Sequence, residues 1–398
     1  MKTLQIKDAR ALYADSEGVW LARGMKYWKA SYDGRPIGEK FSVGGVKDKV
    51  LSLHRLSRQL LRVGIHHILP LKNGNVLVST KKRTYIVDAT GQVINRFEGF
   101  RGNKPAQFGI CEDDEGNIFF GEYTINLAND HPTSLYRSTD GGKTFGTPVT
   151  VLRGSNGKNG NCGVHKNPQN FMYHNGRIYR SMEWGAWANK VYGHAAMVAS
   201  CPEDADLLDP ESWSFSEPVP FPYDHPDFAG MPTNTMTIEG TLVKDPSGKL
   251  LNIMRFGKYH KAIVYEVNTT DPEAPLTYVR QMDFPANYSK FTIKYDSVSN
   301  YYYTICTRVW TEEKKNARNL LSFMRSRDLV SWELVCDIFD RRDADEKLVG
   351  FQYVMFEMEG DDIIFLCRTA INGAHTFHDS NYMTFHRIKN FRTSPTVE

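Results

Sequence analysis

The chain is built from one recurring unit: an apolar strand, a tight turn rich in Gly, Asn or Asp, and a second apolar strand. Seven such hairpins can be read along the 398 residues, at 11–22, 68–78, 108–120, 171–179, 241–251, 291–303 and 353–365. Successive units begin about 40–70 residues apart, and each is followed by further strand-like sequence. Four strands per unit at this period predict an all-β fold: a β-propeller of four-stranded blades, with seven blades or alternatively six. We expect residues 1–398 to form a single propeller domain.

Composition excludes several classes of partner. The 49 basic and 46 acidic side chains nearly balance, and no long Lys/Arg run occurs, which argues against nucleic acid. No apolar run is long enough to cross a membrane. The first ten residues lack the apolar core of a signal peptide, so we expect a cytoplasmic protein as written, or a secreted or periplasmic one whose signal has been trimmed. The six Cys are predicted to be buried thiols, and neither a metal nor a cofactor is expected.

Polar residues recur at one place in the unit. In a propeller, the residues before the innermost strand and those after the second strand meet on one face, near the central axis. The residues found before the first strand are Arg10, His66, His67, Gln107, His165 to Gln169, Glu239, Lys290 and Gln352. Those found after the second strand are Arg23, Glu122, Tyr123, Glu183, Arg255, Arg308 and Arg368.

Strand ends are often polar, so a solvated rim is the simpler interpretation of these positions. It does not explain why four Arg and two Glu follow the second strand of the unit. Guanidinium groups that converge on one place can bind a carboxylate or sulfate through paired hydrogen bonds. Neighbouring Glu, His and Tyr supply proton-transfer groups. The sequence therefore predicts a site for an anionic ligand on this face.

Residues 138–145, Ser-Thr-Asp-Gly-Gly-Lys-Thr-Phe, resemble the Asp-box (BNR repeat) of sialidases and related propellers. Its Asp can hydrogen-bond the backbone that follows, and its Gly residues allow positive φ. Looser versions occur at 326–332 and 31–34, and 200–213 looks like a box opened by an insertion. The resemblance implies that each box closes the hairpin between the two outer strands of a blade. It implies architecture and names no substrate.

A second resemblance concerns catalysis. Residues 237–255 are similar to the sialidase segment in which a glutamate, paired with the nucleophilic tyrosine, precedes an arginine of the carboxylate-binding triad. This implies that Glu239 activates a tyrosine and that Arg255 binds a carboxylate. Arg10, followed by Ala-Leu in place of Ile-Pro, would be the first triad arginine, and Arg308 the third. Tyr353 is the nearest match to the nucleophile.

The same resemblance implies a retaining mechanism, in which a tyrosine attacks the anomeric carbon of an anionic sugar. Arg23 and Arg368 are further anion-binding candidates, and Gln352 and Tyr123 further substrate contacts. The family's acid/base aspartate is not found in its usual context. Glu122 or Glu183 would take that role.

Three functions follow from these patterns, each with an acidic oligosaccharide or polysaccharide as partner. The first is a sialidase-like exo-glycoside hydrolase acting on a carboxylate-bearing sugar. The alternative is a polysaccharide lyase that cleaves a uronate glycan, such as a rhamnose–glucuronate linkage, by β-elimination. His67, His165 and Tyr123 would suit that chemistry. The third is a glycan-binding propeller without catalysis.

Overall fold

The computed structural model describes the strands within residues 10–42 and then most of the chain from residue 67. The described residues are 10–14, 19–23, 26–30, 36–42, 67–79, 83–88, 93–98, 106–123, 133–152, 164–165, 169, 171–185, 194–232, 235, 237–257, 260–286, 288–371 and 374–397. Their regular structure is β-strand, apart from short 3-10 helices at η2 (Pro210–Ser212), η3 (Pro226–Phe228) and η4 (Glu312–Lys314). No helix in these ranges has the length and apolarity that crossing a bilayer requires.

Consecutive strands form antiparallel sheets, in the order in which they occur in the chain. The first sheet is β1 (Arg10–Ala14), β2 (Val19–Arg23), β3 (Lys26–Ala30) and β4 (Pro36–Ser42). The second is β5 (His67–Pro70), β6 (Val76–Ser79), β7 (Arg83–Val87) and β8 (Val93–Glu98). The third is β9 (Ala106–Glu112), β10 (Ile118–Tyr123), β11 (Thr133–Ser138) and β12 (Val149–Leu152).

The fourth sheet has a divided inner strand, because β13 and β14 both pair with β15. It comprises β13 (Val164–His165), β14 (Met172–His174), β15 (Arg177–Trp184), β16 (Ala195–Pro202) and β17 (Ser214–Phe215). The fifth is β18 (Ile238–Lys244), β19 (Leu250–Arg255), β20 (Lys261–Glu266) and β21 (Thr277–Asp283). The sixth is β22 (Ile293–Asp296), β23 (Tyr301–Thr307), β24 (Leu320–Ser326) and β25 (Glu333–Asp340). The seventh is β26 (Gly350–Glu359), β27 (Asp362–Ala370), β28 (Tyr382–Lys389) and β29 (Thr396–Val397).

Six of these sheets are the blades of a propeller. Each sheet from β5–β8 onward shares a hydrophobic cluster with the next, and the sixth such cluster joins the last blade to the β5–β8 blade. In that closing cluster Met355 and Phe385 pack with Ile68 and Val76. Packing on both faces of the blade buries every residue of the second strand β19, whereas the outer strand β21 has one buried residue, Met282, and is otherwise half-buried or exposed. Burial of apolar area between blades therefore closes the ring.

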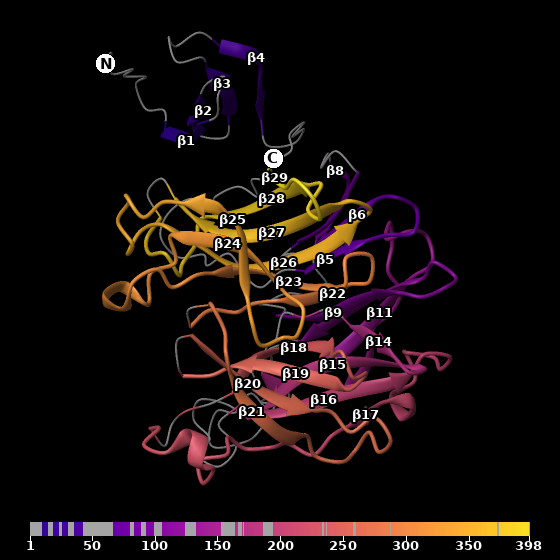
Figure 1. The fold of residues 1–398 in the computed structure, drawn as a ribbon. Coiled ribbons are helices and arrows are strands. Elements are labelled where there is room, and N and C mark those ends of the chain that lie inside the picture. Colours follow the sequence, from indigo (N-terminus) through magenta and orange to yellow (C-terminus); the bar gives the residue numbers. More distant parts are fainter. Residues whose placement is uncertain are drawn as a thin grey trace.

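The remaining sheet, β1–β4, pairs only within itself in the described residues and lies apart from the ring in Figure 1. The expectation of seven blades was therefore wrong for the ring, and the alternative of six was right. The first repeat does form a four-stranded sheet, but the ring closes between β26 and β5 without it. The β-propeller fold and its four-stranded blades are confirmed.

The last blade takes all four of its strands, β26 to β29, from the C-terminal end of the described chain. No strand from the N-terminal part completes it among the residues described. Side-chain packing, and not a shared sheet, therefore joins the two ends of the ring.

The turn at residues 138–145 connects the third and fourth strands of its blade, β11 and β12, as predicted. Asp140 accepts hydrogen bonds from the amides of Lys143 and Thr144, both at 2.9 Å, and Ser138 Oγ accepts one from the Gly142 amide. The turn between β24 and β25 repeats this pattern, because Ser326 donates to Asp328 and Asp328 accepts from two following amides. Residues 31–34 lie outside the described residues.

Two glycines in left-handed turns allow a test of blade packing. Gly142 has φ +84°, and a Cβ there would lie 2.8 Å from Ile86 Cδ1 in the adjacent blade. Gly74 has a similar φ of +82°, but a Cβ there would meet no atom within 4 Å. We expect Gly74→Ala to lower the free energy of unfolding by about 1 kcal/mol through backbone strain. Gly142→Ala should lower it by about 2–4 kcal/mol because overpacking is added. Urea denaturation measures both, and equal losses would contradict the interface.

Candidate functional site

The strand register brings together the residues that the sequence places before the first strand and after the second. Gln107 pairs with Glu122, His165 with Glu183, and Gln352 with Arg368. For Arg10, Arg23, His67, Glu122, Tyr123 and His165, only the position on a strand is described, not the side chain. The candidate site is therefore built from the blades that begin at β13, β18, β22 and β26.

Two inner strands share the same departure from regular pairing. In β18 the ladder runs from Ile238↔Arg255 to Thr241↔Ile253, and in β26 from Gln352↔Arg368 to Met355↔Leu366. Each bulge leaves two residues unpaired with the second strand. The first of them is left-handed in both cases: Glu239 has φ 56° and Tyr353 has φ 55°. Such a backbone costs about 1–2 kcal/mol for a side chain with a Cβ, and its occurrence points to a site that needs it.

Gly240 makes the first bulge possible. A Cβ at this position would lie 2.2 Å from Asn252 Oδ1 and 2.4 Å from Ser181 Oγ, so only glycine fits between the two blades. The chain can therefore turn abruptly after Glu239 and direct the Glu239 carboxylate toward the end of β19.

Arg255 joins the two bulged residues. Its Nε donates to Glu239 Oε2 at 2.7 Å, and its Nη2 lies 3.4 Å from the Tyr353 hydroxyl. Its guanidinium also sits over the Tyr288 ring, 4.6 Å from the centroid. Arg255, Glu239 and Tyr353 are 7%, 3% and 8% exposed, so the contact between them is largely shielded from water.

Two more arginines contact residues of the Tyr353 bulge, Arg368 at Tyr353 itself and Arg318 at the adjoining Gln352. The Arg368 guanidinium lies 4.6 Å from the centroid of the Tyr353 ring and donates to the His378 carbonyl. Arg318 donates to the Gln352 side-chain oxygen and to the Tyr288 carbonyl. Gln352 in turn donates to the Phe377 carbonyl at 2.6 Å, which ties this group to the loop between β27 and β28. We call Arg255, Arg318 and Arg368 the arginine cluster.

The arginine cluster is electropositive. Glu239 forms an ion pair with Arg255, while Arg318 and Arg368 place two further positive charges close to the same phenol. Burial, together with the charges of Arg255 and Arg368, lowers the pKa of Arg318 to about 10, so Arg318 still carries its charge at neutral pH. Burying several guanidinium groups close together costs free energy unless an anion compensates their charge. The arrangement is therefore suited to a carboxylate or sulfate.

Glu239 and Tyr353 have perturbed surroundings of their own. Burial, reinforced by the Glu239 charge, raises the pKa of Tyr353, so the phenol stays protonated at neutral pH. For Arg255, burial acts to lower the pKa, but the charge of Glu239 and the nearby phenols outweigh it and raise the pKa. Arg255 is therefore a permanent cation placed between a carboxylate and a protonated phenol.

Glu183 lies behind this group. It is fully buried, and its Oε1 accepts a 2.5 Å hydrogen bond from the Glu239 backbone amide. Burial and the nearby Glu239 charge raise the pKa of Glu183 well above its usual value. Glu183, which belongs to the preceding blade, therefore stabilises the bulge at Glu239. The protonated, neutral form of the Glu183 carboxyl group is favoured.

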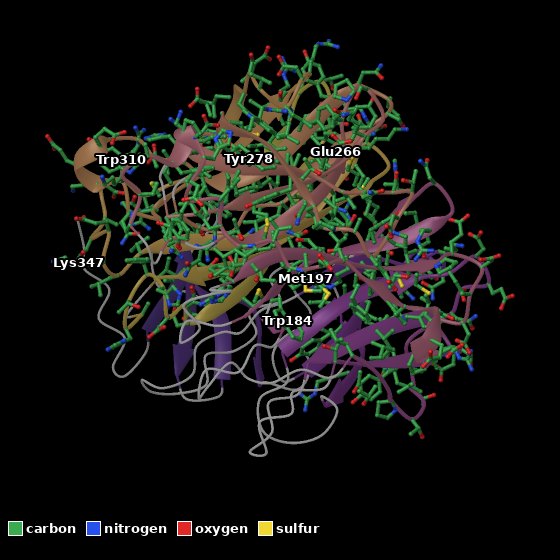
Figure 2. The ribbon with its side chains drawn as sticks, turned by 90° about the horizontal axis from the view of Figure 1, so that it is seen from below. Trp184, Met197, Glu266, Tyr278, Trp310 and Lys347 are labelled. Carbon is green, nitrogen blue, oxygen red and sulfur yellow. The ribbon has the colours of Figure 1, made fainter. Side chains whose placement is uncertain are left out.

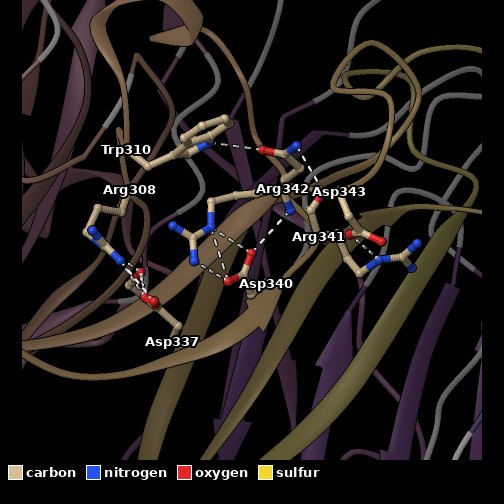
Figure 3. A network of polar contacts seen from close by, with 9 residues as sticks. Arg308, Trp310, Asp337, Asp340, Arg341, Arg342 and Asp343 are labelled. Atoms are coloured by element: carbon tan, nitrogen blue, oxygen red, sulfur yellow. Dashed lines mark hydrogen bonds and ion pairs between the residues drawn. The ribbon is translucent and has the colours of Figure 1, made fainter.

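Arg308 does not join the arginine cluster. Its Nη2 donates to both oxygens of Asp337 at 2.8 and 2.9 Å, and its Nε donates to Ser322 (Figure 3). The neighbouring Trp310 donates to the Asn319 side chain and is flanked by Lys314 and Arg342. Figure 2 places Trp310 and Lys347 on one side of the molecule, whereas Trp184 and Met197 lie nearer its middle.

The sequence patterns missed Arg318 and Tyr288. Both lie in connections, Arg318 between β23 and β24 and Tyr288 between β21 and β22, and not at the strand ends that the repeat singles out. The nearest signal is a second arginine ten positions after Arg308, and nothing local distinguishes the two. No group of His, Cys, Asp or Glu side chains suited to a metal is found within the described ranges.

No protein-family model matches the chain, and no curated protein matches its sequence. The fold has solved counterparts. An α-L-arabinofuranosidase from Fusarium graminearum gives a TM-score of 0.59 at 11% identity, over 86% of this chain and 97% of that one. A Trypanosoma rangeli sialidase gives 0.55 at 10% identity, over 90% of this chain and 56% of that one. An ulvan lyase bound to GlcA(1-4)Rha3S gives 0.51 at 9% identity, over 96% and 89%. The chain therefore shares its fold with carbohydrate-active propeller enzymes.

The raised pKa of Glu183 predicts a pH-dependent difference in stability. A Glu in the unfolded chain titrates near pH 4.5, whereas folded Glu183 binds its proton more tightly, so the wild type loses stability as pH rises from there toward the folded pKa. Glu183→Gln keeps the acceptor for the Glu239 amide and does not titrate. We expect its free energy of unfolding, relative to the wild type, to increase between about pH 5 and about pH 8.

Urea denaturation at both pH values measures this difference. Asp296→Asn is the control, because hydrogen bonds from Arg392 lower the pKa of Asp296 to about 2, below the tested window. Its loss of stability should be the same at both pH values. If the difference in free energy of unfolding between Glu183→Gln and the wild type is the same at both pH values, the pKa of Glu183 is not raised in the folded protein.

Proposed function

We propose that this protein is a carbohydrate-active enzyme that binds an acidic sugar through its arginine cluster and hydrolyses it as sialidases do. One observation carries the proposal: Arg255 contacts both Glu239 and Tyr353, while Arg368 lies over the Tyr353 ring and Arg318 donates to the adjoining Gln352. This arrangement supports the proposal, because an anion bound by the arginines would lie beside a carboxylate–tyrosine pair. The shared fold with a sialidase adds support at the level of architecture.

In this proposal the arginine cluster holds the sugar carboxylate and Tyr353 is the nucleophile. A neutral phenol approaches an anionic sugar without the repulsion that a carboxylate would meet. As the Tyr353 oxygen bonds to the anomeric carbon, its proton passes to Glu239 and the leaving-group oxygen takes a proton from an acid. Water then attacks the anomeric carbon, and the reverse proton transfers restore both groups. Arg255 stabilises Glu239 as a carboxylate and the phenolate that develops on Tyr353.

The acid role falls to Glu122 in this scheme. Of the two candidates, Glu183 is fully buried and already bonded to the Glu239 backbone, so it positions Glu239. Glu122 is the residue before the last of β10 and pairs with Gln107, the register position that Arg368 occupies opposite Gln352. Arg318 and Arg368 replace Arg10 and Arg308 as the second and third carboxylate-binding arginines in this proposal. Arg308 is instead bound to Asp337, and β1, which carries Arg10, lies apart from the ring.

A uronate-cleaving lyase is the second candidate, and it uses the same residues differently. The arginine cluster would neutralise the uronate carboxylate, which acidifies the neighbouring C–H, and Tyr353 would exchange a proton with the ring. The fold shared with an ulvan lyase supports this second candidate at the level of architecture. His67, His165 and Tyr123, whose strands are described, would then be further candidates for proton transfer.

Product analysis separates the candidates. We expect the protein, incubated with sialosides and with glucuronate-containing oligosaccharides, to release new reducing ends without the ultraviolet absorbance of an unsaturated uronate. An absorbing product would make the protein a lyase. Binding of an acidic sugar without turnover would support the glycan-binding alternative.

Variants test the roles of individual residues. Tyr353→Phe should lower kcat by about 100-fold or more, because the nucleophile or proton donor is removed while the arginine cluster stays.

Arg318→Met should weaken binding of an acidic sugar by roughly 30-fold, because one charged hydrogen-bond donor is lost.

Arg308→Met is the matched control for Arg318→Met. It removes an arginine from the same connection between β23 and β24 but breaks only the contact with Asp337 and Ser322. It should leave affinity within about twofold, measured by calorimetry. Equal weakening by the two substitutions would contradict the arginine cluster as the anion site.

A further inference from the structure

Lys290 is a buried lysine that the proposed mechanism does not use. It lies just before β22 and is 2% exposed. Its Nζ donates to Thr292 Oγ1 at 2.7 Å and lies 3.5 Å from the Val354 carbonyl oxygen and 3.0 Å from Met355 Sδ. Thr292 Oγ1 in turn donates to the same Val354 oxygen at 3.0 Å. Two donors of one blade thus converge on one backbone carbonyl of the next.

That carbonyl belongs to the bulge that carries Tyr353. The β26–β27 register has no partner opposite Tyr353 and Val354, so regular pairing does not fix their conformation. The left-handed φ of Tyr353 is unfavourable and persists only if surrounding contacts impose it. Lys290 and Thr292 provide such contacts from outside the strand.

The second bulge shows the same arrangement. The Glu239 amide donates to Glu183, which belongs to the blade that precedes β18. Lys290 and Thr292 lie directly before β22, the first strand of the blade that precedes β26. Both bulges are therefore contacted by polar side chains from the side of the preceding blade, a carboxyl group at Glu239 and an ammonium group with a hydroxyl at Val354.

We propose that Lys290 is a positioning residue that, with Thr292, fixes the left-handed bulge at Tyr353 through the Val354 carbonyl, and that its protonation makes this positioning dependent on pH. The consequence for catalysis rests on the proposed role of Tyr353. The positioning itself does not.

The charges around Lys290 support a change of protonation near neutrality. Burial lowers the pKa of Lys290 to about 7. From the elements packed around it, Glu239 favours the charged form, while Arg180, Lys294 and Arg255 disfavour it. A protonated amine is a stronger donor to a carbonyl than a neutral one, so the hold on Val354 weakens as pH rises through this range.

Hydrogen exchange followed by mass spectrometry tests the inference without requiring turnover. In Lys290→Met, amides of the segment 350–356 should exchange about tenfold faster than in the wild type, with the rest of the ring unchanged. In the wild type, protection of this segment, corrected for intrinsic exchange, should fall between about pH 6 and about pH 8, and in Lys290→Met it should not.

Two further variants separate the charge of Lys290 from its hydrogen bond. Thr292→Val removes one donor to Val354 and no charge, so it should speed exchange at all pH values and keep the pH dependence.

Lys294→Met is the matched control, because Lys294 also reaches the β26 blade, through Glu357 at 2.7 Å, but does not contact the bulge. At about pH 6, where Lys290 is charged in both proteins, it should leave exchange of Gln352–Met355 unchanged. Unchanged exchange in Lys290→Met, with the wild-type pH dependence retained, overturns the inference.

Kinetic measurements test the consequence for catalysis separately. Where the wild type hydrolyses an acidic glycoside, Lys290→Met should lower kcat about tenfold, leave KM within about twofold, and lose the decline of kcat above neutral pH. Faster exchange in a protein that turns over no acidic glycan would refute the proposed function and leave the positioning role intact. Altered kcat with unaltered exchange would refute the positioning role and leave the function intact.

Discussion

The structure depends on apolar packing between neighbouring blades, and above all on the contact that closes the ring. Every blade–blade interface contains its own hydrophobic cluster, and the one between the last blade and the β5–β8 blade is built as the others are. Because no strand is exchanged there in the described residues, closure depends on side-chain shape and apolar area alone. The central face on which the strand ends meet exists only once this contact has formed.

The candidate site arises where two inner strands leave regular pairing. A regular ladder would direct Glu239 and Tyr353 alternately to the faces of their blades, into the packed interfaces. The bulges turn both residues toward Arg255, at the end of a second strand. The cost of two left-handed residues is offset by contacts from the preceding blades, through Glu183 in one case and Lys290 with Thr292 in the other.

Much of the fold could be predicted because a hairpin is a local feature: alternating apolar residues around a Gly or Asn turn specify it within about 12 residues. The number of blades in the ring could not, because closure is a contact between residues some 290 positions apart, such as Ile68 and Met355. The strand-end rule singled out Glu239, Arg255 and Arg368, and the resemblance to sialidases added Tyr353. It could not distinguish Arg308 from Arg318, because the carboxylate that binds Arg308 belongs to Asp337, on an outer strand 29 positions away.

The closing contact and the candidate site share part of one strand. Met355 packs in the cluster that joins the last blade to the β5–β8 blade, and it lies two residues after Tyr353, within reach of Lys290. A transient separation of the last blade from the β5–β8 blade would therefore displace the Tyr353 backbone before any other blade came apart. Heat or denaturant would then inactivate such an enzyme at a lower dose than it unfolds the sheets, so that activity would report on the integrity of the ring.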